Sequence, residues 1–392
     1  KNWTGGVLGG IPLLNNGADV PQFWSPQTVV TKLDNLTNWD SNWRAGALRT
    51  YRRYAVAMDI TKSSVRNARM VKWSHAAPTG AVPASWDEAD ETVDAGEVEL
   101  ADTDGAVVDG ARMRDALLLY KTDSVHAMQY VGGIDVFRFS QLFDDFGILS
   151  RRCAVSYKKG RHAVFALGDI IEHDGQNWES IIDSRMRRWL FSQIDPTNYE
   201  TCFVALNAVK TEVWFCFPLL GASLPNRALV WNFKANTFGV RELPSAAHIM
   251  PGLVQPVNTG DIWNNDSEVW DADPSTWDEG AANPAGNRLL IADAGATKLF
   301  RGDETSQFAA VNFTSRIERT GLPLPVKEDG PPDMRSRKLI GGIWPRITGT
   351  LGGIVKVTVG GQEVVDGPVS WGPPQNFIIG TSRRLPVLFN TV

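Results

Sequence analysis

Short apolar runs, each followed by turn-forming residues, recur along this 392-residue chain. Residues 105–178 are the clearest example, with apolar runs at 115–120, 124–130, 163–167 and 170–173. The pairs between them are Thr122-Asp123, Gly132-Gly133, Lys159-Gly160 and Asp174-Gly175. Runs of this length and spacing predict antiparallel strands, and several in a row are typical of a sandwich, barrel or propeller.

The strand pattern recurs outside this stretch. Further strands are predicted at residues 49–60, 69–74, 201–206, 212–217, 228–233, 237–241, 288–292, 298–300 and 309–318. Matching strands of successive groups are about 40–50 residues apart, as in propeller blades. We therefore predict a mainly β fold of propeller-like repeated antiparallel meanders.

One amphipathic helix interrupts the strand pattern at residues 180–194. Its apolar residues, spaced for one helical face, are Ile181, Ile182, Met186, Trp189, Leu190 and Ile194. Ser180 is the expected N-cap, and Asp195-Pro196 is expected to end the helix.

Composition divides the chain into four parts. Residues 1–42 are rich in Gly, Asn and Pro, and we expect an extended segment with little regular structure. The propeller-like domain is expected at 43–322, followed by a Pro/Gly/acid linker at 323–338. Residues 339–392 predict a small C-terminal β unit, either a sandwich or a last blade. The chain starts without Met, which suggests a piece of a longer product, and no signal peptide is apparent.

The charge balance argues against a protein that grips nucleic acid. The net charge is −5, and no basic stripe is present. The nearest candidates, Arg49 with Arg52-Arg53 and Arg185 with Arg187-Arg188, are short, and we interpret them as solvated faces or interface pairs. No apolar run is long enough to span a bilayer. The three cysteines, Cys153, Cys202 and Cys216, have no C-x-x-C spacing and are interpreted as reduced, small hydrophobic residues.

No catalytic or metal-binding motif stands out. The five histidines, His75, His126, His162, His173 and His248, have no i,i+4 pair, and structural or surface roles are expected. The motif His173-Asp174-Gly175-Gln176-Asn177-Trp178 is similar to the Asp-box turn of sialidase propellers, which is itself a structural hairpin. A glycosidase needs two carboxylates across a cleft, and nothing singles out such a pair.

Two acidic loops are possible cation sites. Residues 264–279 contain Asp266, Asp271, Asp273 and Asp278, whose oxygens could hold Ca²⁺. Trp263, Trp270 and Trp277 recur there every seven residues, so we favour aromatic anchors that pin a long loop. The loop 86–94 is interpreted in the same way. We therefore predict no catalytic, cofactor-binding or metal-binding residues and no cofactor.

The succession of these segments resembles the tail nozzle, or tail tubular, proteins of short-tailed bacteriophages. The resemblance begins with GVLGGIPLLNNGADVPQFW and covers most of the chain in order, without one decisive motif. Its segments are residues 6–24, 33–61, 71–133, 146–191, 315–322 and 369–381.

The resemblance implies a β-propeller subunit of a homohexameric ring in the virion tail. Its partners would be the adaptor below the portal and the tail fibres or spikes, and DNA would pass through its lumen without specific binding. An acidic duct suits this role because it repels phosphates. The chain stops at Val392, where such proteins commonly add a further segment, so the C-terminal unit is expected to be incomplete.

The leading hypothesis is thus a non-enzymatic virion protein that forms a channel for genome ejection. The alternative is a propeller that binds or cleaves host-surface glycan, with an axial pocket lined by paired carboxylates or exposed aromatics. A host-derived scaffold propeller is a third, weaker reading.

Overall fold

The computed structural model describes residues 3–24, 32–133, 135–253, 287–302, 307–308, 311–312, 315–318, 342–361 and 368–386. The chain divides into two compact units, Lys1–Thr305 and Ser306–Val392.

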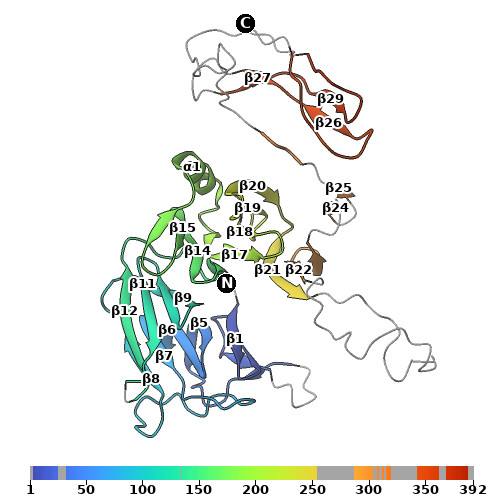
Figure 1. The fold of residues 1–392 in the computed structure, drawn as a ribbon. Helices are drawn as coiled ribbons and strands as arrows, with labels where there is room; N and C mark the ends of the chain where they lie inside the picture. The colour runs from blue at the N-terminus through green and yellow to red at the C-terminus, as the bar shows by residue number, and fades with distance from the viewer. Residues whose placement is uncertain are drawn as a thin grey trace, which may run out of the picture. The chain divides into compact units, whose positions relative to one another are not determined.

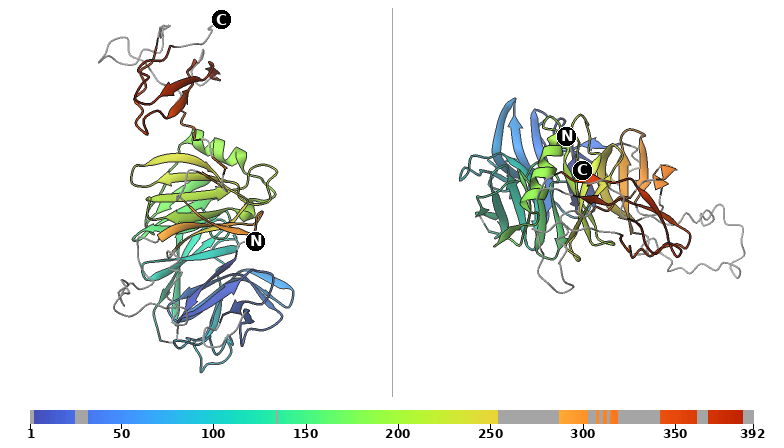
Figure 2. Two further views of the ribbon diagram at one scale, coloured as in Figure 1. Left: turned by 90° about the vertical axis from the view of Figure 1, so that its right-hand side faces the viewer. Right: turned by 90° about the horizontal axis from the view of Figure 1, so that it is seen from above.

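Unit 1 is a six-bladed β-propeller, which confirms the predicted fold class. Each of the first five blades is a four-stranded antiparallel meander, and the sixth has three strands among the described residues. In Figure 1 the blades follow one another in chain order, from blue blade 1 through teal and green to yellow and orange blade 6, and Figure 2 shows them from two further sides.

The strands of blades 1 to 3 are β1 (Thr4–Leu8), β2 (Ile11–Asn15), β3 (Gln22–Phe23), β4 (Asp34–Asn35), β5 (Trp43–Tyr51), β6 (Tyr54–Lys62), β7 (Val65–Trp73), β8 (Gly96–Glu99), β9 (Val107–Met113), β10 (Ala116–Lys121), β11 (Val125–Tyr130) and β12 (Phe137–Phe143). Those of blades 4 to 6 are β13 (Ala154–Lys158), β14 (Arg161–Ala166), β15 (Asp169–His173), β16 (Trp178–Ser180), β17 (Phe203–Asn207), β18 (Glu212–Phe217), β19 (Arg227–Asn232), β20 (Thr237–Glu242), β21 (Ala246–Leu253), β22 (Asn287–Asp293) and β23 (Lys298–Arg301).

Neighbouring blades contact each other through their first strands, in the sequence β1, β5, β9, β13, β17 and β21. Apolar cores fill the spaces between successive blades. A middle strand is therefore covered on both faces, and its sequence is a continuous apolar run, as in β10 (ALLLYK) and β18 (EVWFCF). The outer strand β20 lies at an edge and is mostly exposed.

The N-terminal segment is the largest correction to the predicted fold. Residues 1–42 were expected to have little regular structure, but β1 to β4 form a complete blade there. Two of its four strands are only two residues long. Strands this short leave too few residues for a period-2 pattern, and the Gly and Asn residues of the segment serve as turns between them.

The predicted strand at 49–60 is in fact a hairpin. β5 and β6 pair in antiparallel register, with Tyr51 opposite Tyr54 and Arg52-Arg53 as the turn. Arg52 has a φ of 54°, in the left-handed region that Gly and Asn usually occupy. With two arginines in place of those residues, the sequence carries no turn signal.

The predicted helix exists, and it is the one α-helix among the described residues. It is α1 (Ser184–Gln193), followed by a single 3₁₀ turn, η1 (Tyr199–Thr201). The N-cap is Asp183, whose Oδ1 accepts from the Met186 amide at 2.7 Å, so the predicted cap at Ser180 was wrong. Ser180 ends β16, and its hydroxyl donates to Asp169 Oδ1 at 2.8 Å. Of the helical residues, only Leu190 is fully buried.

Unit 2 contains short antiparallel pairs. They are β24 (Gln307–Phe308) with β25 (Val311–Asn312), β26 (Ile354–Val357) with β29 (Gln375–Ile378), and β27 (Gly360–Gly361) with β28 (Ser370–Trp371). The predicted linker at 323–338 lies outside the described residues.

Candidate functional site

A buried polar cluster links the first strands of five blades near the propeller axis. Arg49 in β5 donates to Asp109 in β9 through Nε at 2.7 Å and Nη2 at 2.6 Å. Arg49 Nη1 also donates to the Gly5 carbonyl in β1 at 3.2 Å. Asp109 Oδ2 accepts from the Arg152 amide before β13 at 2.7 Å, and the Arg152 guanidinium donates to the His248 ring in β21. The cluster therefore ties blades 1, 2, 3, 4 and 6 together.

Burial and charge set the protonation states of this cluster. Burial alone would raise the pKa of Asp109, but the Arg49 guanidinium and its hydrogen bonds outweigh burial and lower it. Burial, and then the nearby Arg49, lower the pKa of Arg152 to about 10. Burial, and then Arg152, lower the pKa of His248 to about 3. At neutral pH the cluster thus holds two arginines, one carboxylate and a neutral histidine.

Arg49 corrects our interpretation of the basic groups. We expected it on a solvated face or in an interface pair, but its side chain is only 19% exposed and is held by Asp109. Nothing in the local sequence identifies a partner that is 60 residues away.

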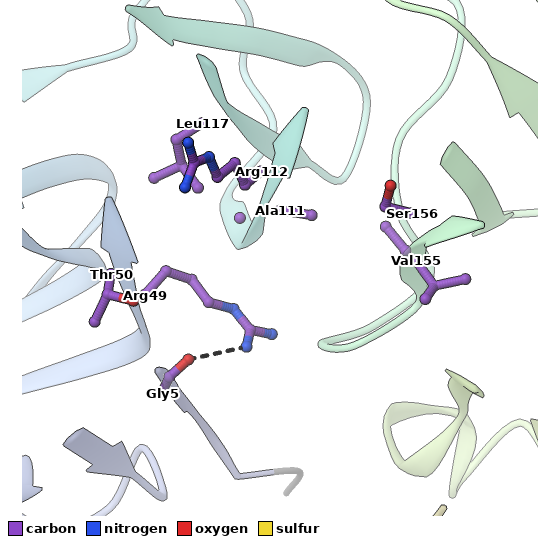
Figure 3. Close-up of a pocket in the computed structure, with 10 residues that line it drawn as sticks. Gly5, Arg49, Thr50, Ala111, Arg112, Leu117, Val155 and Ser156 are labelled. Atoms are coloured by element: carbon purple, nitrogen blue, oxygen red, sulfur yellow. Dashed lines mark hydrogen bonds between the residues drawn. The ribbon is translucent and has the colours of Figure 1, made fainter. Parts of the chain in front are cut away.

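A cavity of about 250 Å³ opens beside this cluster, between the first strands of blades 1 to 4. Its lining residues are Gly5, Arg49, Thr50, Gly110, Ala111, Arg112, Leu117, Ala154, Val155 and Ser156. Figure 3 shows the Arg49 side chain reaching from β5 towards Gly5, with Val155 and Ser156 on the opposite side. The glycan alternative predicted a pocket lined by paired carboxylates or exposed aromatic side chains. None of the ten residues that line this cavity is a carboxylate or an aromatic residue.

The groups in this pocket suit binding better than acid–base chemistry. Its charged lining residues are Arg49 and Arg112, and a guanidinium group donates hydrogen bonds but accepts none. Arg49 is already engaged by Asp109 and Gly5, whereas Arg112 is exposed and donates through Nε to the Arg114 carbonyl at 3.3 Å. No described residue accepts from the Arg112 terminal nitrogens, so they are available to an anion.

A second buried network joins blades 3 and 4 through two histidines. His162 in β14 lies directly opposite His173 in β15. The Tyr120 hydroxyl lies 2.7 Å from His162 Nδ1 and 2.8 Å from His173 Nε2. Because His162 Nε2 must donate to the Arg112 carbonyl at 3.0 Å, its Nδ1 accepts from Tyr120, and the tyrosine oxygen accepts from His173. His173 Nδ1 remains buried without a partner among the described residues.

Burial keeps both histidines of this network neutral. It lowers the pKa of His162 to about 4, against the opposing effect of the Arg112 carbonyl. For His173, burial and then the neighbouring His162 lower the pKa to about 3. The sequence interpretation of structural histidines agrees with this geometry, but it did not foresee that the two side chains meet.

The Asp-box-like motif is a structural turn, as predicted. Asp174 Oδ1 accepts from the amides of Gln176 at 2.9 Å and Asn177 at 2.8 Å, between β15 and β16. Gly175 has a φ of 90°, which a residue with a Cβ adopts only with strain.

The acidic loop at 86–94 is anchored as expected. Trp86 is 2% exposed and packs edge-on against Trp39 at 4.8 Å. Glu88 pairs with Lys62 at 3.2 Å and with the fully buried Lys72, so it serves the fold. The other acidic loop, 264–279, lies outside the described residues.

The three cysteines are buried free thiols, in accordance with the sequence interpretation. Burial raises the pKa of Cys153 to about 12 and those of Cys202 and Cys216 well above the usual value. Such thiols are poor nucleophiles and poor metal ligands. Within the described ranges, no three His, Cys, Asp or Glu side chains converge as a metal site.

No helix in the described part of the chain is long and apolar enough to cross a membrane.

Comparisons with known proteins add the following findings. No family model and no curated protein matches the chain. Among solved structures, Hsv2 from Kluyveromyces marxianus is 9% identical, with a TM-score of 0.39 over 81% of this chain and 78% of that one. Regucalcin from Agrobacterium tumefaciens is 12% identical, with a TM-score of 0.38 over 74% and 80%. The Synechocystis apocarotenoid oxygenase is 10% identical, with a TM-score of 0.35 over 76% and 67%. At these scores the likenesses carry no functional argument, and the propeller assignment comes from the sheet topology itself.

Proposed function

We propose that this chain is a structural subunit of the tail nozzle of a short-tailed bacteriophage. Several copies would form a ring, for which the resemblance implies six, whose lumen conducts DNA during ejection. The ring would sit in the virion tail, between the adaptor below the portal and the fibres or spikes. The resemblance implied a propeller, and a propeller is the fold of unit 1.

The observation that carries this proposal is the exposed apolar surface of unit 2. Among the described residues, its large apolar side chains with more than a third of their area exposed are Ile317 (99%), Trp344 (66%), Leu351 (81%), Ile354 (63%), Trp371 (41%) and Ile378 (37%). Only Phe377 and Leu385 are buried in the described part of this unit after residue 341. Ile354 and Ile378 lie opposite each other in the β26–β29 pair. Contiguous exposed apolar residues mark interaction surfaces, and obligate assemblies bury them between subunits.

Charge supports the channel role. Residues 1–305 contain 29 Lys and Arg against 38 Asp and Glu, a formal charge of −9. A ring of acidic propellers would repel DNA phosphates, so a duplex would slide through it without being retained.

The mass of the purified full-length chain in solution tests the proposal. We expect a closed ring of several copies by native mass spectrometry, visible as annular particles by electron microscopy. A chain that stays monomeric at all concentrations, and also in the presence of a portal adaptor, would contradict the proposed function.

A second candidate function, binding of an acidic glycan, is favoured by one observation, the axial cavity. Its volume of about 250 Å³ lies below the roughly 300–1,000 Å³ of drug-sized sites, so it would admit a molecule of monosaccharide size. Two arginines and the hydroxyls of Thr50 and Ser156 line it, a set that matches a sugar carboxylate and its hydroxyl groups.

Calorimetric titration with glucuronic acid tests this candidate. Binding is expected to weaken about tenfold or more in Arg112→Ala, because the arginine with free terminal nitrogens is removed. Arg138→Ala, an exposed arginine outside the cavity, serves as the matched control. If glucuronic acid and neutral glucose give the same absence of heat, the glycan candidate is rejected.

A further inference from the structure

The two units carry opposite net charge. Residues 306–392 contain 10 Lys and Arg against 6 Asp and Glu, a formal charge of +4, while residues 1–305 carry −9. Within the described residues after 341 the contrast is sharper, since Arg346, Lys356, Arg383 and Arg384 are present and no carboxylate is. A basic, apolar unit and an acidic propeller are electrostatically complementary.

The exposed face of unit 2 is defined by strand register. Ile354 in β26 lies opposite Ile378 in β29, and Lys356 lies opposite Asn376. Ile354, Lys356, Asn376 and Ile378 alternate with the less exposed Val355 and with the buried Phe377, so they share one face of the pair. That face is apolar at one end and positively charged at the other. We call these four residues the β26–β29 face.

The described part of the propeller contains a stretch of matching charge. Residues 86–104, which include β8 at the edge of blade 2, contain nine carboxylates and no basic residue. Some are neutralised within blade 2, where Glu88 and Glu97 pair with lysines and Glu99 pairs with Arg69 at 2.7 Å. Asp87, Glu91 and Asp102 are exposed. Asp104 is also fully exposed, although its Oδ1 lies 3.6 Å from Arg69 Nη1.

We propose that the β26–β29 face docks on the acidic edge of blade 2 in a second copy of this chain. The inference rests on the proposed function and names the contact that would join neighbouring subunits. Ile354 and Ile378 supply the apolar part of the contact, and Lys356 pairs with carboxylates of residues 86–104 on the neighbour. The same contact repeated from copy to copy is heterologous, and heterologous contacts form a ring when the rotation from copy to copy closes.

Zero-length carbodiimide cross-linking of the full-length chain tests which copy is contacted. Unlabelled and ¹⁵N-labelled chains are mixed, allowed to exchange, and treated with a carbodiimide that joins lysine amines to carboxylates. We expect peptides that join Lys356 to residues 86–104, with mixed isotope pairs among them. If all such links join peptides of the same isotope, the unit docks on its own propeller, and the inference is overturned.

Variants of the face give an independent measurement. Ile354→Ser combined with Lys356→Glu is expected to raise the concentration for half-assembly by about tenfold or more. The matched control is Val209→Ser with Lys234→Glu, an exposed valine and lysine of blade 5, which is expected to leave assembly unchanged. Adding salt is expected to weaken assembly of the unaltered chain, since exposed charges are screened.

The outcomes separate this inference from the proposed function. If the unaltered chain assembles and the Ile354/Lys356 variant assembles equally well, the ring stands and this interface is wrong. If the unaltered chain never assembles, the proposed function itself fails. Circular dichroism of both variants verifies that the propeller remains folded.

Discussion

Replacing Asp109 by Asn is expected to lower the free energy of unfolding of the propeller by about 3–5 kcal/mol. Asp109 is 4% exposed and is the carboxylate that neutralises Arg49, which is itself largely buried. Removing one partner of a buried ion pair leaves the other charge uncompensated in a poorly solvated place, at a cost in this range. The midpoint of urea denaturation at neutral pH, followed by tryptophan fluorescence, measures the effect.

An exposed ion pair provides the control for Asp109. Glu242 pairs with Arg227 at 2.9 Å, but its side chain is 80% exposed. Glu242→Gln is expected to change stability by less than about 1 kcal/mol. The double variant Arg49→Met with Asp109→Leu removes both charges and is expected to recover part of the loss. Equal, small effects of Asp109→Asn and Glu242→Gln would show that the axial pair does not hold the blades together.

Lowering the pH is expected to destabilise the propeller already below pH 6.5, well above the pH range in which most carboxylates titrate. His162 and His173 have folded pKa values of about 4 and 3, against about 6.5 in an unfolded chain. Below pH 6.5 the unfolded state therefore binds more protons than the folded state, and stability falls as the pH falls. At pH 5 the difference is about 2 kcal/mol for each histidine, or about 4 kcal/mol for the pair.

Denaturation midpoints between pH 7.5 and 4.5 measure this dependence. His162→Phe with His173→Phe is expected to remove most of this slope, since the neutral pair is replaced by groups that do not titrate. The share of His248, whose pKa burial also lowers to about 3, is expected to remain. Tyr120→Phe is the matched control, because it removes the hydroxyl that joins the two rings and leaves both histidines. It is expected to lower stability by about 1–3 kcal/mol at pH 7.5 and to retain the slope below pH 6.5. A slope that is unchanged in the double histidine variant would assign the acid sensitivity to other groups.

Hairpins with Gly or Asp turns were predictable from sequence, and others were not. The Gly132-Gly133 and Asp174-Gly175 pairs mark turns because their residues suit the backbone conformations that turns require. The Arg52-Arg53 turn has no such mark, because its conformation is imposed by the pairing of β5 with β6. The short strands of blade 1 were missed because a two-residue strand has no detectable periodicity.

The histidine pair could have been found from the same pattern. His162 and His173 are equidistant from the turn at Leu167-Gly168, so antiparallel pairing of two predicted strands places them opposite each other. The axial cluster could not have been found in this way. Arg49, Asp109, Arg152 and His248 come from four blades, and only closure of the propeller brings them together.

The described strands of each blade come from one continuous segment of the chain, and this affects how the protein folds during synthesis. Every described strand of blades 1 to 6 pairs with a strand of its own blade, nearby in sequence, and none of these described strands pairs with a strand from the other end of the propeller. Local pairings close quickly, so each meander can form as soon as it has emerged from the ribosome. The hydrogen bond from Arg152 to His248 must wait until blade 6 has been made. We therefore expect the nascent chain to gain protease resistance blade by blade, with a last increase when β21 becomes available.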